Sequence, residues 1–138
     1  MKTLLDNDYC RIDHVDTIKA IRLQYKRSLK SDEFKNAFRT VLQGFEQNKC
    51  ENYLSDSTRQ GVVAMENQKW LETEIIPKAV KVGLKRIVTV VPKDVFTKFY
   101  VANMKSKTDQ KGGLEFRYFE NLQDGENYIQ SFYPPSVN

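Results

Sequence analysis

Cysteine and histidine are scarce in this chain, and their scarcity excludes several classes of protein. Among 138 residues there are two cysteines, Cys10 and Cys50, and one histidine, His14. The cysteines are too few for a disulfide scaffold or a Cys2His2 zinc site, and each is expected to be a small buried hydrophobe. His14 has no second histidine and no recognisable triad. We therefore expect no metal site, no cofactor and no catalytic histidine.

Long apolar runs are also missing. No stretch approaches the roughly 20 residues that a membrane-spanning helix needs. The N-terminus lacks the apolar segment of a secretory signal, so we expect a cytoplasmic protein. A length of 138 residues is that of one domain with one core. The expected domain spans 1–138, with its ordered core at about 8–133.

The excess of positive charge is not gathered into a tail. Twenty-two Lys and Arg against eighteen Asp and Glu give a net charge of +4, which both halves of the chain share equally. Basic residues gather in 19–30 and in 78–111, and aromatic residues intersperse the second cluster. Because these aromatics have helical spacing and the lysines are spread over three elements, a solvated basic face is favoured over nucleic-acid or anionic-membrane binding.

A hairpin and a helix are predicted in the first third of the chain. Residues 9–15 and 18–25 are rich in β-branched and aromatic side chains and are separated by two residues, which predicts two antiparallel strands. Apolar residues then recur from Phe34 to Phe45 at the spacing of one helical face. Ser31 precedes them and is a favoured N-cap residue. This is the clearest amphipathic helix in the sequence.

Strands and helices alternate through the remaining residues. Strands are predicted at 50–55, 84–91 and 114–119, and helices at 64–82, 94–104 and 122–132. The run 84–91 is almost wholly apolar and β-branched, which is typical of a strand covered on both faces. The order ββαβαβαβα predicts an α/β fold with a single five-stranded mixed sheet and helices packed against it.

A few residues mark where the predicted helices bend or end. Pro77 cannot donate to the carbonyl four residues earlier, so the helix 64–82 should kink near Ile76 or consist of two pieces that meet there. Gly83 suits the left-handed residue that ends a helix. Asn121 is expected to cap the last helix, with Asp124 completing a shortened capping box.

Aromatic residues on the predicted helices have two interpretations. Trp70, Phe96 and Tyr100 either fill the core against the sheet or wall an apolar pocket, and for Trp70 the core is favoured. The predicted helix 94–104 also has more apolar width than one sheet face covers. A leftover patch there would favour a two-fold self-contact, and hence a homodimer.

The polar segment 56–61 follows a predicted strand, at the edge where open α/β sheets usually bind ligands. Asp56, Ser57 and Thr58 offer oxygen atoms there, and Arg59 can neutralise an anion. The alternative is a simple turn in which Asp56 and Ser57 hydrogen-bond their own backbone. An enzyme that uses Asp56 and Ser57 would lack a visible activating base, so we expect no catalytic residues.

Residues 53–92 resemble the STAS-like bacterial family, whose members are similar to sporulation anti-sigma-factor antagonists and to the CRAL-TRIO lipid-binding domain. The resemblance rests on Trp70, Pro77, the run 83–86 and the strand end 88–92, and elsewhere on the order of elements. The antagonists carry an Asp-Ser-Ser/Thr-Gly-x-Gly segment with a hydroxyl that a partner kinase phosphorylates. In segment 56–61 the Asp, Ser, Thr and final Gly match, whereas arginine replaces the first glycine.

The resemblance implies two functions. As a STAS-like module the protein is expected to be non-catalytic and regulatory, to recognise a protein partner, and to use Thr58 or Ser57 as its switch. As a CRAL-TRIO-like module it would be a carrier or sensor of a small apolar or lipid ligand. The lack of clustered His or Cys and of paired carboxylates favours the first function over an enzyme.

Overall fold

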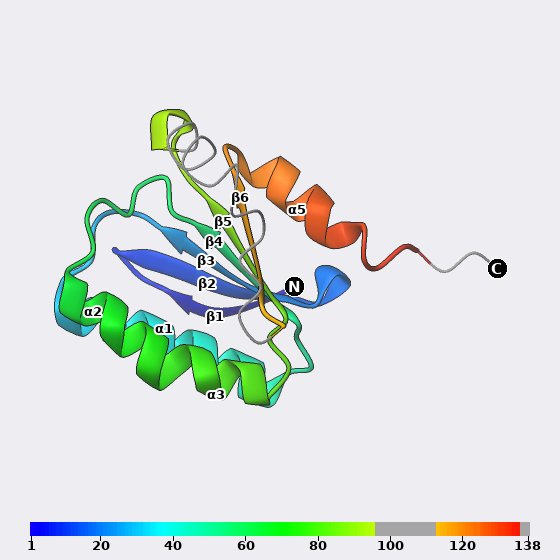
Figure 1. The fold of residues 1–138 in the computed structure, drawn as a ribbon, viewed down its shortest axis with the longest axis horizontal. Helices are drawn as coiled ribbons and strands as arrows, with labels where there is room; N and C mark the ends of the chain where they lie inside the picture. Colours follow the sequence, from blue (N-terminus) through cyan, green and yellow to red (C-terminus); the bar gives the residue numbers. More distant parts are fainter. Residues whose placement is uncertain (96–112, 136–138) are drawn as a thin grey trace.

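An open mixed sheet forms the centre of the molecule (Figure 1). The computed structural model describes residues 1–95 and 113–135, and within them the strand order is β1-β2-β3-β4-β5-β6. Strands β1 to β3 pair antiparallel, and β3 to β6 pair parallel. The bounds are β1 Lys2–Asp6, β2 Cys10–Val15, β3 Ala20–Tyr25, β4 Asn52–Asp56, β5 Arg86–Val90 and β6 Glu115–Phe119.

The sheet has six strands, so the predicted number of five was wrong. The additional strand is β1, which lies before the core range expected from the sequence and pairs with β2 at the edge of the sheet. Only Leu4 and Leu5 of β1 contact the core, and the register shifts between Thr3 and Leu5. Because β1 is a short, mostly exposed edge strand with this irregularity, it lacks the alternation by which strands are recognised. The predicted α/β class with a mixed sheet is confirmed.

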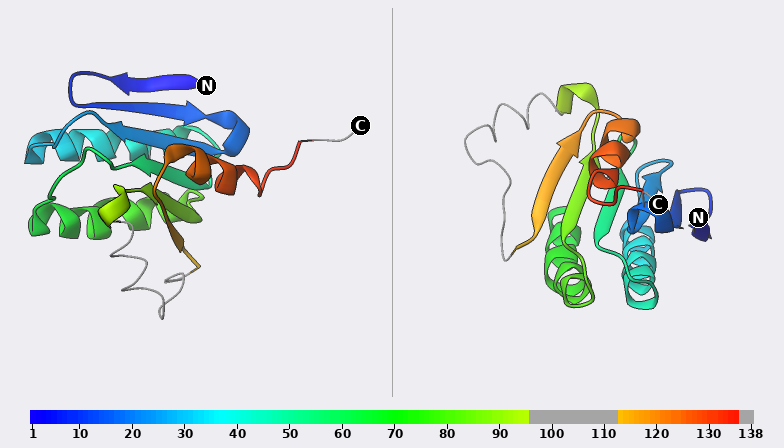
Figure 2. Two further views of the ribbon diagram at one scale, coloured as in Figure 1. Left: turned by 90° about the horizontal axis from the view of Figure 1, so that it is seen from above. Right: turned by 90° about the vertical axis from the view of Figure 1, so that its right-hand side faces the viewer.

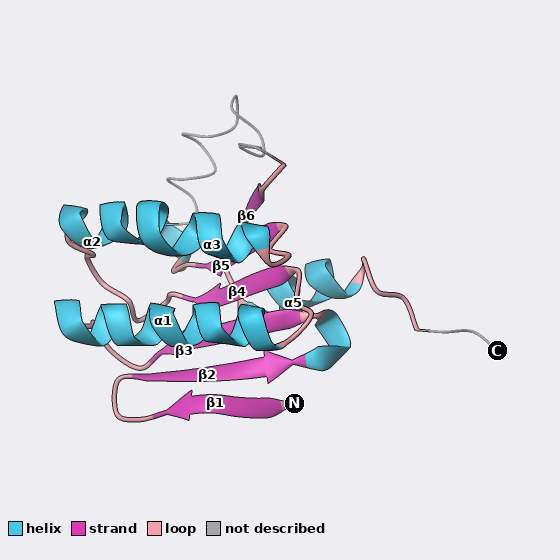
Figure 3. Ribbon diagram, turned by 90° about the horizontal axis from the view of Figure 1, so that it is seen from below, coloured by secondary structure: helices cyan, strands magenta, loops and turns pink. Residues whose placement is uncertain are grey.

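Helices cover the two faces of the sheet unequally. Figure 3 shows α1 (Ser31–Gln47), α2 (Met65–Trp70) and α3 (Ile76–Lys81) over one face, hereafter the first face. Figure 2 shows α5 (Leu122–Gln130) on the opposite, second face. The larger core lies on the first face and includes Ile12, Leu23, Phe38 and Phe45; the smaller one unites Leu54, Val88, Val90 and Ile129.

The predicted hairpin and the first helix are present with one corrected detail. Strands β2 and β3 pair over their whole length around a 3₁₀ turn at Asp16–Ile18. Helix α1 begins at Ser31, so Ser31 is not its N-cap. Its hydroxyl instead accepts a hydrogen bond from Asn67 at 3.1 Å, and the Glu33 carboxylate accepts the Lys30 N–H at 2.9 Å. The Ser31 hydroxyl, which was predicted to cap α1, therefore forms a tertiary contact with α2.

The second helical stretch is divided as its proline predicts. A π-helical segment, Leu71–Ile75, joins α2 to α3, and Pro77 lies in the first turn of α3. The wider turn before the proline accommodates its ring and its missing N–H. Gly83 has φ +121°, and a Cβ atom there would lie 2.8 Å from the Cys50 carbonyl oxygen, so only glycine fits this connection.

The last two predicted strands and the last helix are also confirmed. Strand β5 lies between β4 and β6, with Ile87 buried on the first face and Val88 on the second. At the start of α5 the Asn121 side chain accepts the Asp124 N–H at 2.8 Å and donates to its carboxylate at 3.0 Å. The predicted helix 94–104, with its apolar patch for self-contact, falls almost entirely outside the described residues. No helix in the described part of the chain is long and apolar enough to cross a membrane.

Candidate functional site

The strand register places two rows of side chains side by side on the first face. Tyr53, Ile87 and Phe116 are register partners across β4, β5 and β6. Two residues further along each strand, Ser55, Thr89 and Tyr118 are partners in the same way. Because alternate side chains of a strand share a face, an apolar row and a hydroxyl row both lie on the first face. Ser55 is buried and Thr89 is half-buried, whereas Tyr118 is 38% exposed, so the hydroxyl row runs from the core to the surface.

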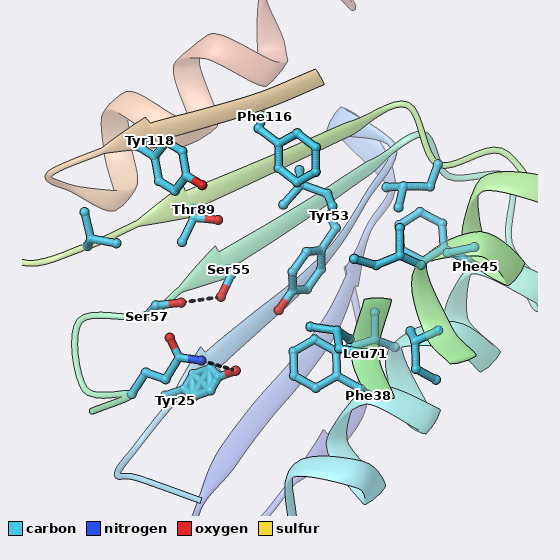
Figure 4. A pocket seen from close by; sticks show the side chains of 18 residues that line it. Tyr25, Phe38, Phe45, Tyr53, Ser55, Ser57, Leu71, Thr89, Phe116 and Tyr118 are labelled. Carbon is cyan, nitrogen blue, oxygen red and sulfur yellow. Dashed lines mark hydrogen bonds between the residues drawn. The ribbon is translucent and has the colours of Figure 1, made fainter. Parts of the chain in front are cut away.

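A cavity of about 300 Å³ separates these rows from α1 and from the helical stretch that ends in α3 (Figure 4). Figure 4 shows an apolar side, where Phe45, Leu71 and Phe116 lie, and a polar side toward the carboxyl ends of the parallel strands. The polar groups in the lining are those of Tyr25, Tyr53, Ser55, Ser57, Gln60, Thr89 and Tyr118. None of the described lining residues carries a charged side chain or a histidine.

Two hydrogen bonds organise the polar side of the cavity. The Ser55 and Ser57 hydroxyl oxygens lie 2.6 Å apart and share one hydrogen bond. Gln60 donates its side-chain amide to the Tyr25 hydroxyl at 3.1 Å. The backbone holds this corner in place, because the Ser57 N–H donates to the Val90 carbonyl at 2.8 Å. Ser57 and Gln60 are therefore fixed parts of the cavity wall.

The Tyr53 hydroxyl is the exception in this wall. Its oxygen is buried, and no group in the described residues meets the distance and angle of a hydrogen bond with it. Figure 4 shows this oxygen directed toward the side of the cavity where Ser55 and Tyr25 lie. Burial raises the pKa of Tyr53, and the nearby Ser55 offsets only part of that rise. Burial, with a smaller effect from Tyr53, likewise raises the pKa of Tyr25. Both phenols are therefore neutral hydrogen-bond donors at physiological pH.

The segment 56–61 forms a turn, and only part of it reaches the cavity. The Asp56 carboxylate accepts the Thr58 N–H at 3.2 Å and the Thr58 hydroxyl at 2.8 Å. Of the four residues singled out in the sequence, Ser57 lines the cavity, whereas Asp56, Thr58 and Arg59 do not. Thr58 and Arg59 are exposed to solvent. The Asp56 contacts are those of the turn alternative, and the ligand role of Ser57 stays a prediction.

Trp70 lies away from the cavity. Its ring contacts Phe34 edge-on, with centroids 6.3 Å apart, and the cationic groups of Lys35 and Arg39 lie over it at 5.8 and 5.5 Å. It therefore packs α2 against α1 at the margin of the first-face core, partly buried and not against the sheet as the core interpretation has it. Phe96 and Tyr100, the other two candidates for a pocket wall, lie outside the described residues.

Most residues of the polar wall were not predicted from the sequence. Tyr53, Ser55 and Ser57 alternate along one strand and its end, and Thr89 interrupts the apolar run of the next. Hydroxyl residues at alternate positions of a strand are the signal that could have found them. Gln60 and Tyr25 had no such signal, since the turn brings them together from segments 35 residues apart.

The described residues hold no cluster of metal-binding side chains, and their two cysteines are protonated at neutral pH. They contain no cluster of three or more His, Cys, Asp or Glu side chains that could hold a metal ion. Burial raises the pKa of both Cys10 and Cys50 to about 11, so neither is a thiolate nucleophile at neutral pH. No described base adjoins the Ser55 and Ser57 hydroxyls. The arrangement can bind and orient a molecule.

Comparison with protein-family models, curated proteins and solved structures finds no match for this chain.

Proposed function

We propose that the protein is a non-catalytic carrier or sensor that binds a small, largely apolar molecule in the first-face cavity. The observation that carries this proposal is the cavity itself, about 300 Å³ in volume, with aromatic and aliphatic walls and one hydroxyl-rich side. This composition, apolar walls with a few convergent polar groups, is that of small-molecule sites, and the volume is at the lower end of their range.

The space opens to solvent on one side, where Tyr118 in its lining is 38% exposed, and its inner part lies between packed side chains. Protein interiors are as dense as organic crystals, and voids larger than one water are few. A cavity of about 300 Å³ corresponds to the liquid volume of about ten waters. The aromatic rings of Phe38, Phe45 and Tyr53 forgo dispersion contacts across this space. A bound molecule would restore those contacts and stabilise the folded state.

A regulatory role through a protein partner is the second candidate, and the turn after β4 favours it. Ser57 and Gln60 belong to the cavity wall, while Thr58 and Arg59 between them face solvent. A ligand that contacts the first pair would therefore lie under the surface formed by the second pair. This arrangement would let a STAS-like surface report on cavity occupancy, and it combines both functions that the resemblance implies.

A neutral fluorescent probe tests the cavity directly. N-phenyl-1-naphthylamine brightens in apolar sites and carries no charge, so its titration measures cavity binding. The variant Thr89→Phe places a ring in the cavity, and we expect it to weaken probe binding at least tenfold. Thr17→Phe is the matched control, because Thr17 is exposed in the 3₁₀ turn away from the cavity; this variant should bind like the wild type.

Equal probe affinity in wild type and Thr89→Phe, with both folded by circular dichroism, would refute the proposal. Should Thr89→Phe fail to fold, Ala79→Leu fills the same space from α3, where Ala79 is buried in the lining. A native mass spectrum of protein purified from its own host adds a second measurement. A bound mass of a small organic molecule supports a carrier, and an increment of one phosphate on Thr58 or Ser57 supports the regulatory switch.

A further inference from the structure

We infer that the ligand is uncharged and presents a carbonyl or similar hydrogen-bond acceptor to the hydroxyl side of the cavity. This inference rests on the proposed function and specifies the chemistry of the molecule that the cavity takes. It follows from two properties of the wall: the absence of charge among its described residues, and the surplus of hydroxyl hydrogens without an acceptor.

The absence of charge decides against acids and phosphates. A carboxylate or phosphate in this cavity would lose its hydration, and no cationic side chain in the described lining would compensate. A cationic ligand meets the same difficulty, since no carboxylate lines the cavity there either. A neutral molecule loses far less hydration free energy when it enters the cavity. The described part of the wall therefore favours an uncharged ligand over a charged one of the same size.

The hydrogen-bond pattern decides what the neutral ligand must offer. The Tyr53 hydroxyl has no partner among the described residues, and the Tyr25 hydroxyl accepts from Gln60 but has no described acceptor for its own hydrogen. The serine pair uses one of its two hydroxyl hydrogens. Both phenols are protonated at physiological pH, as free tyrosine is, and burial raises their pKa values further. Two phenol hydrogens of the wall are therefore unused within the described residues, and a carbonyl oxygen, with two lone pairs, can accept a hydrogen bond from each of them.

The remaining surface of the cavity indicates the chemistry of the rest of the ligand. Beyond Tyr53 the wall consists of rings and aliphatic chains, with Phe45, Leu71 and Phe116 on that side (Figure 4). A ligand with its acceptor near Tyr53 would extend its hydrocarbon part toward these residues. The class is therefore a compact ketone, ester or amide with one apolar end.

Three compounds of nearly equal shape separate the possibilities. Butyrophenone carries a ketone, butylbenzene has no polar atom, and 4-phenylbutyrate carries a carboxylate. Each is titrated against protein loaded with N-phenyl-1-naphthylamine. We expect butyrophenone to displace the probe at a concentration about tenfold lower than butylbenzene, as one added hydrogen bond allows, and 4-phenylbutyrate to be the weakest. Displacement by 4-phenylbutyrate at or below the butyrophenone concentration would overturn the inference.

Tyr53→Phe tests the donor itself. Without the hydroxyl, butyrophenone should bind about tenfold more weakly, while butylbenzene should be unaffected. Tyr9→Phe is the matched control, because the Tyr9 hydroxyl bonds to Asn36 outside the cavity lining. An unchanged preference for the ketone in Tyr53→Phe would contradict the assigned role.

The two proposals fail in distinguishable ways. If Thr89→Phe leaves probe binding intact, the cavity is not the site and the proposed function fails. If Thr89→Phe abolishes probe binding but the three compounds displace the probe equally, the cavity is the site and only the inferred acceptor is wrong.

Discussion

Two sets of buried polar side chains lie on opposite faces of the sheet, and they differ in how they are paired. On the second face, the fully buried Asp13 carboxylate accepts hydrogen bonds from Thr3 at 2.9 Å, Arg11 at 3.0 Å and Arg22 at 3.2 Å. On the first face, Tyr53 has no described partner and the Tyr25 hydrogen has no described acceptor. A paired group strengthens the fold, whereas an unpaired one costs stability until something binds to it. Pairing therefore separates residues that hold the structure from residues suited to a ligand.

A second paired cluster stands where the parallel strands begin. Asn52 donates its amide to the Ile18 carbonyl at 2.9 Å and to the Tyr133 hydroxyl at 3.0 Å. Arg86 donates to the same hydroxyl at 3.2 Å, and that hydroxyl donates to Glu51. This cluster fastens the segment after α5 to the sheet. Both clusters contain positive and negative side chains that neutralise one another. The described residues of the cavity wall carry no charged side chain.

The largest expected effect is that of breaking the Asp13 cluster. Asp13→Ala removes the acceptor of Thr3 and both arginines, and among the described residues it leaves the mostly buried Arg22 with Glu126 as its one anionic partner. We expect a loss of about 3 kcal/mol in the free energy of unfolding, the low end for a broken buried pair because Arg11 is partly exposed. Urea denaturation measures it. Asp16→Ala, at an exposed carboxylate, should change stability by at most about 0.5 kcal/mol. Equal losses in the two variants would show that the burial of the carboxylate does not determine the loss of stability.

The same substitution in the two regions sharpens the comparison. Tyr133→Phe leaves Asn52, Arg86 and Glu51 without a shared hydroxyl, so we expect a loss of about 1–2 kcal/mol. Tyr53→Phe removes a hydroxyl that bonds to no described group, so stability should stay within about 0.5 kcal/mol or rise. Thermal unfolding of both variants without added ligand is the measurement. A larger loss in Tyr53→Phe would mean that this hydroxyl already has a partner in the folded protein.

Acid stability tests a paired group nearer the surface. Hydrogen bonds from Arg27 and from the Lys30 N–H lower the pKa of Glu33 to about 2, against 4.5 for the free side chain. A carboxyl whose pKa is lowered on folding stabilises the protein fully above 4.5 and loses that contribution as the pH falls toward 2. Glu33→Gln should therefore show a smaller fall in Tm between pH 5 and 2.5 than the wild type. Glu46→Gln on the same helix is the control, and a wild-type-like fall in Glu33→Gln would contradict this assignment.

The smallest expected effect on stability belongs to the exposed part of the turn after β4. Thr58→Asp and Arg59→Ala should each change the free energy of unfolding by at most about 0.5 kcal/mol. If this surface recognises a partner, either change should alter partner pull-down while Tm stays constant. Unchanged pull-down in both variants would remove Thr58 and Arg59 as functional residues. A large fall in Tm would instead show that the turn is structural.

Local patterns predicted most elements because they depend on neighbouring residues. The helical spacing from Phe34 to Phe45 indicated α1, and the apolar run 84–91 indicated an internal strand. Asn121 and Asp124 form the reciprocal cap that their spacing implies. Strand β1 was missed, since an exposed edge strand is stabilised by pairing with its neighbour and has little pattern of its own.

The sequence by itself determined the α/β class, the order of most elements and the scarcity of histidine and cysteine. Periodicity and capping depend on residues close in the chain, and composition is a count over the chain. Only the tertiary structure decided which polar residues meet. The register of β4 and β5 brings Ser55 beside Thr89, and the turn after β4 brings Gln60 to Tyr25. Whether a hydroxyl is paired depends on atoms far away in the chain, so no local pattern distinguishes Tyr53, which has no described partner, from Tyr133, which has three.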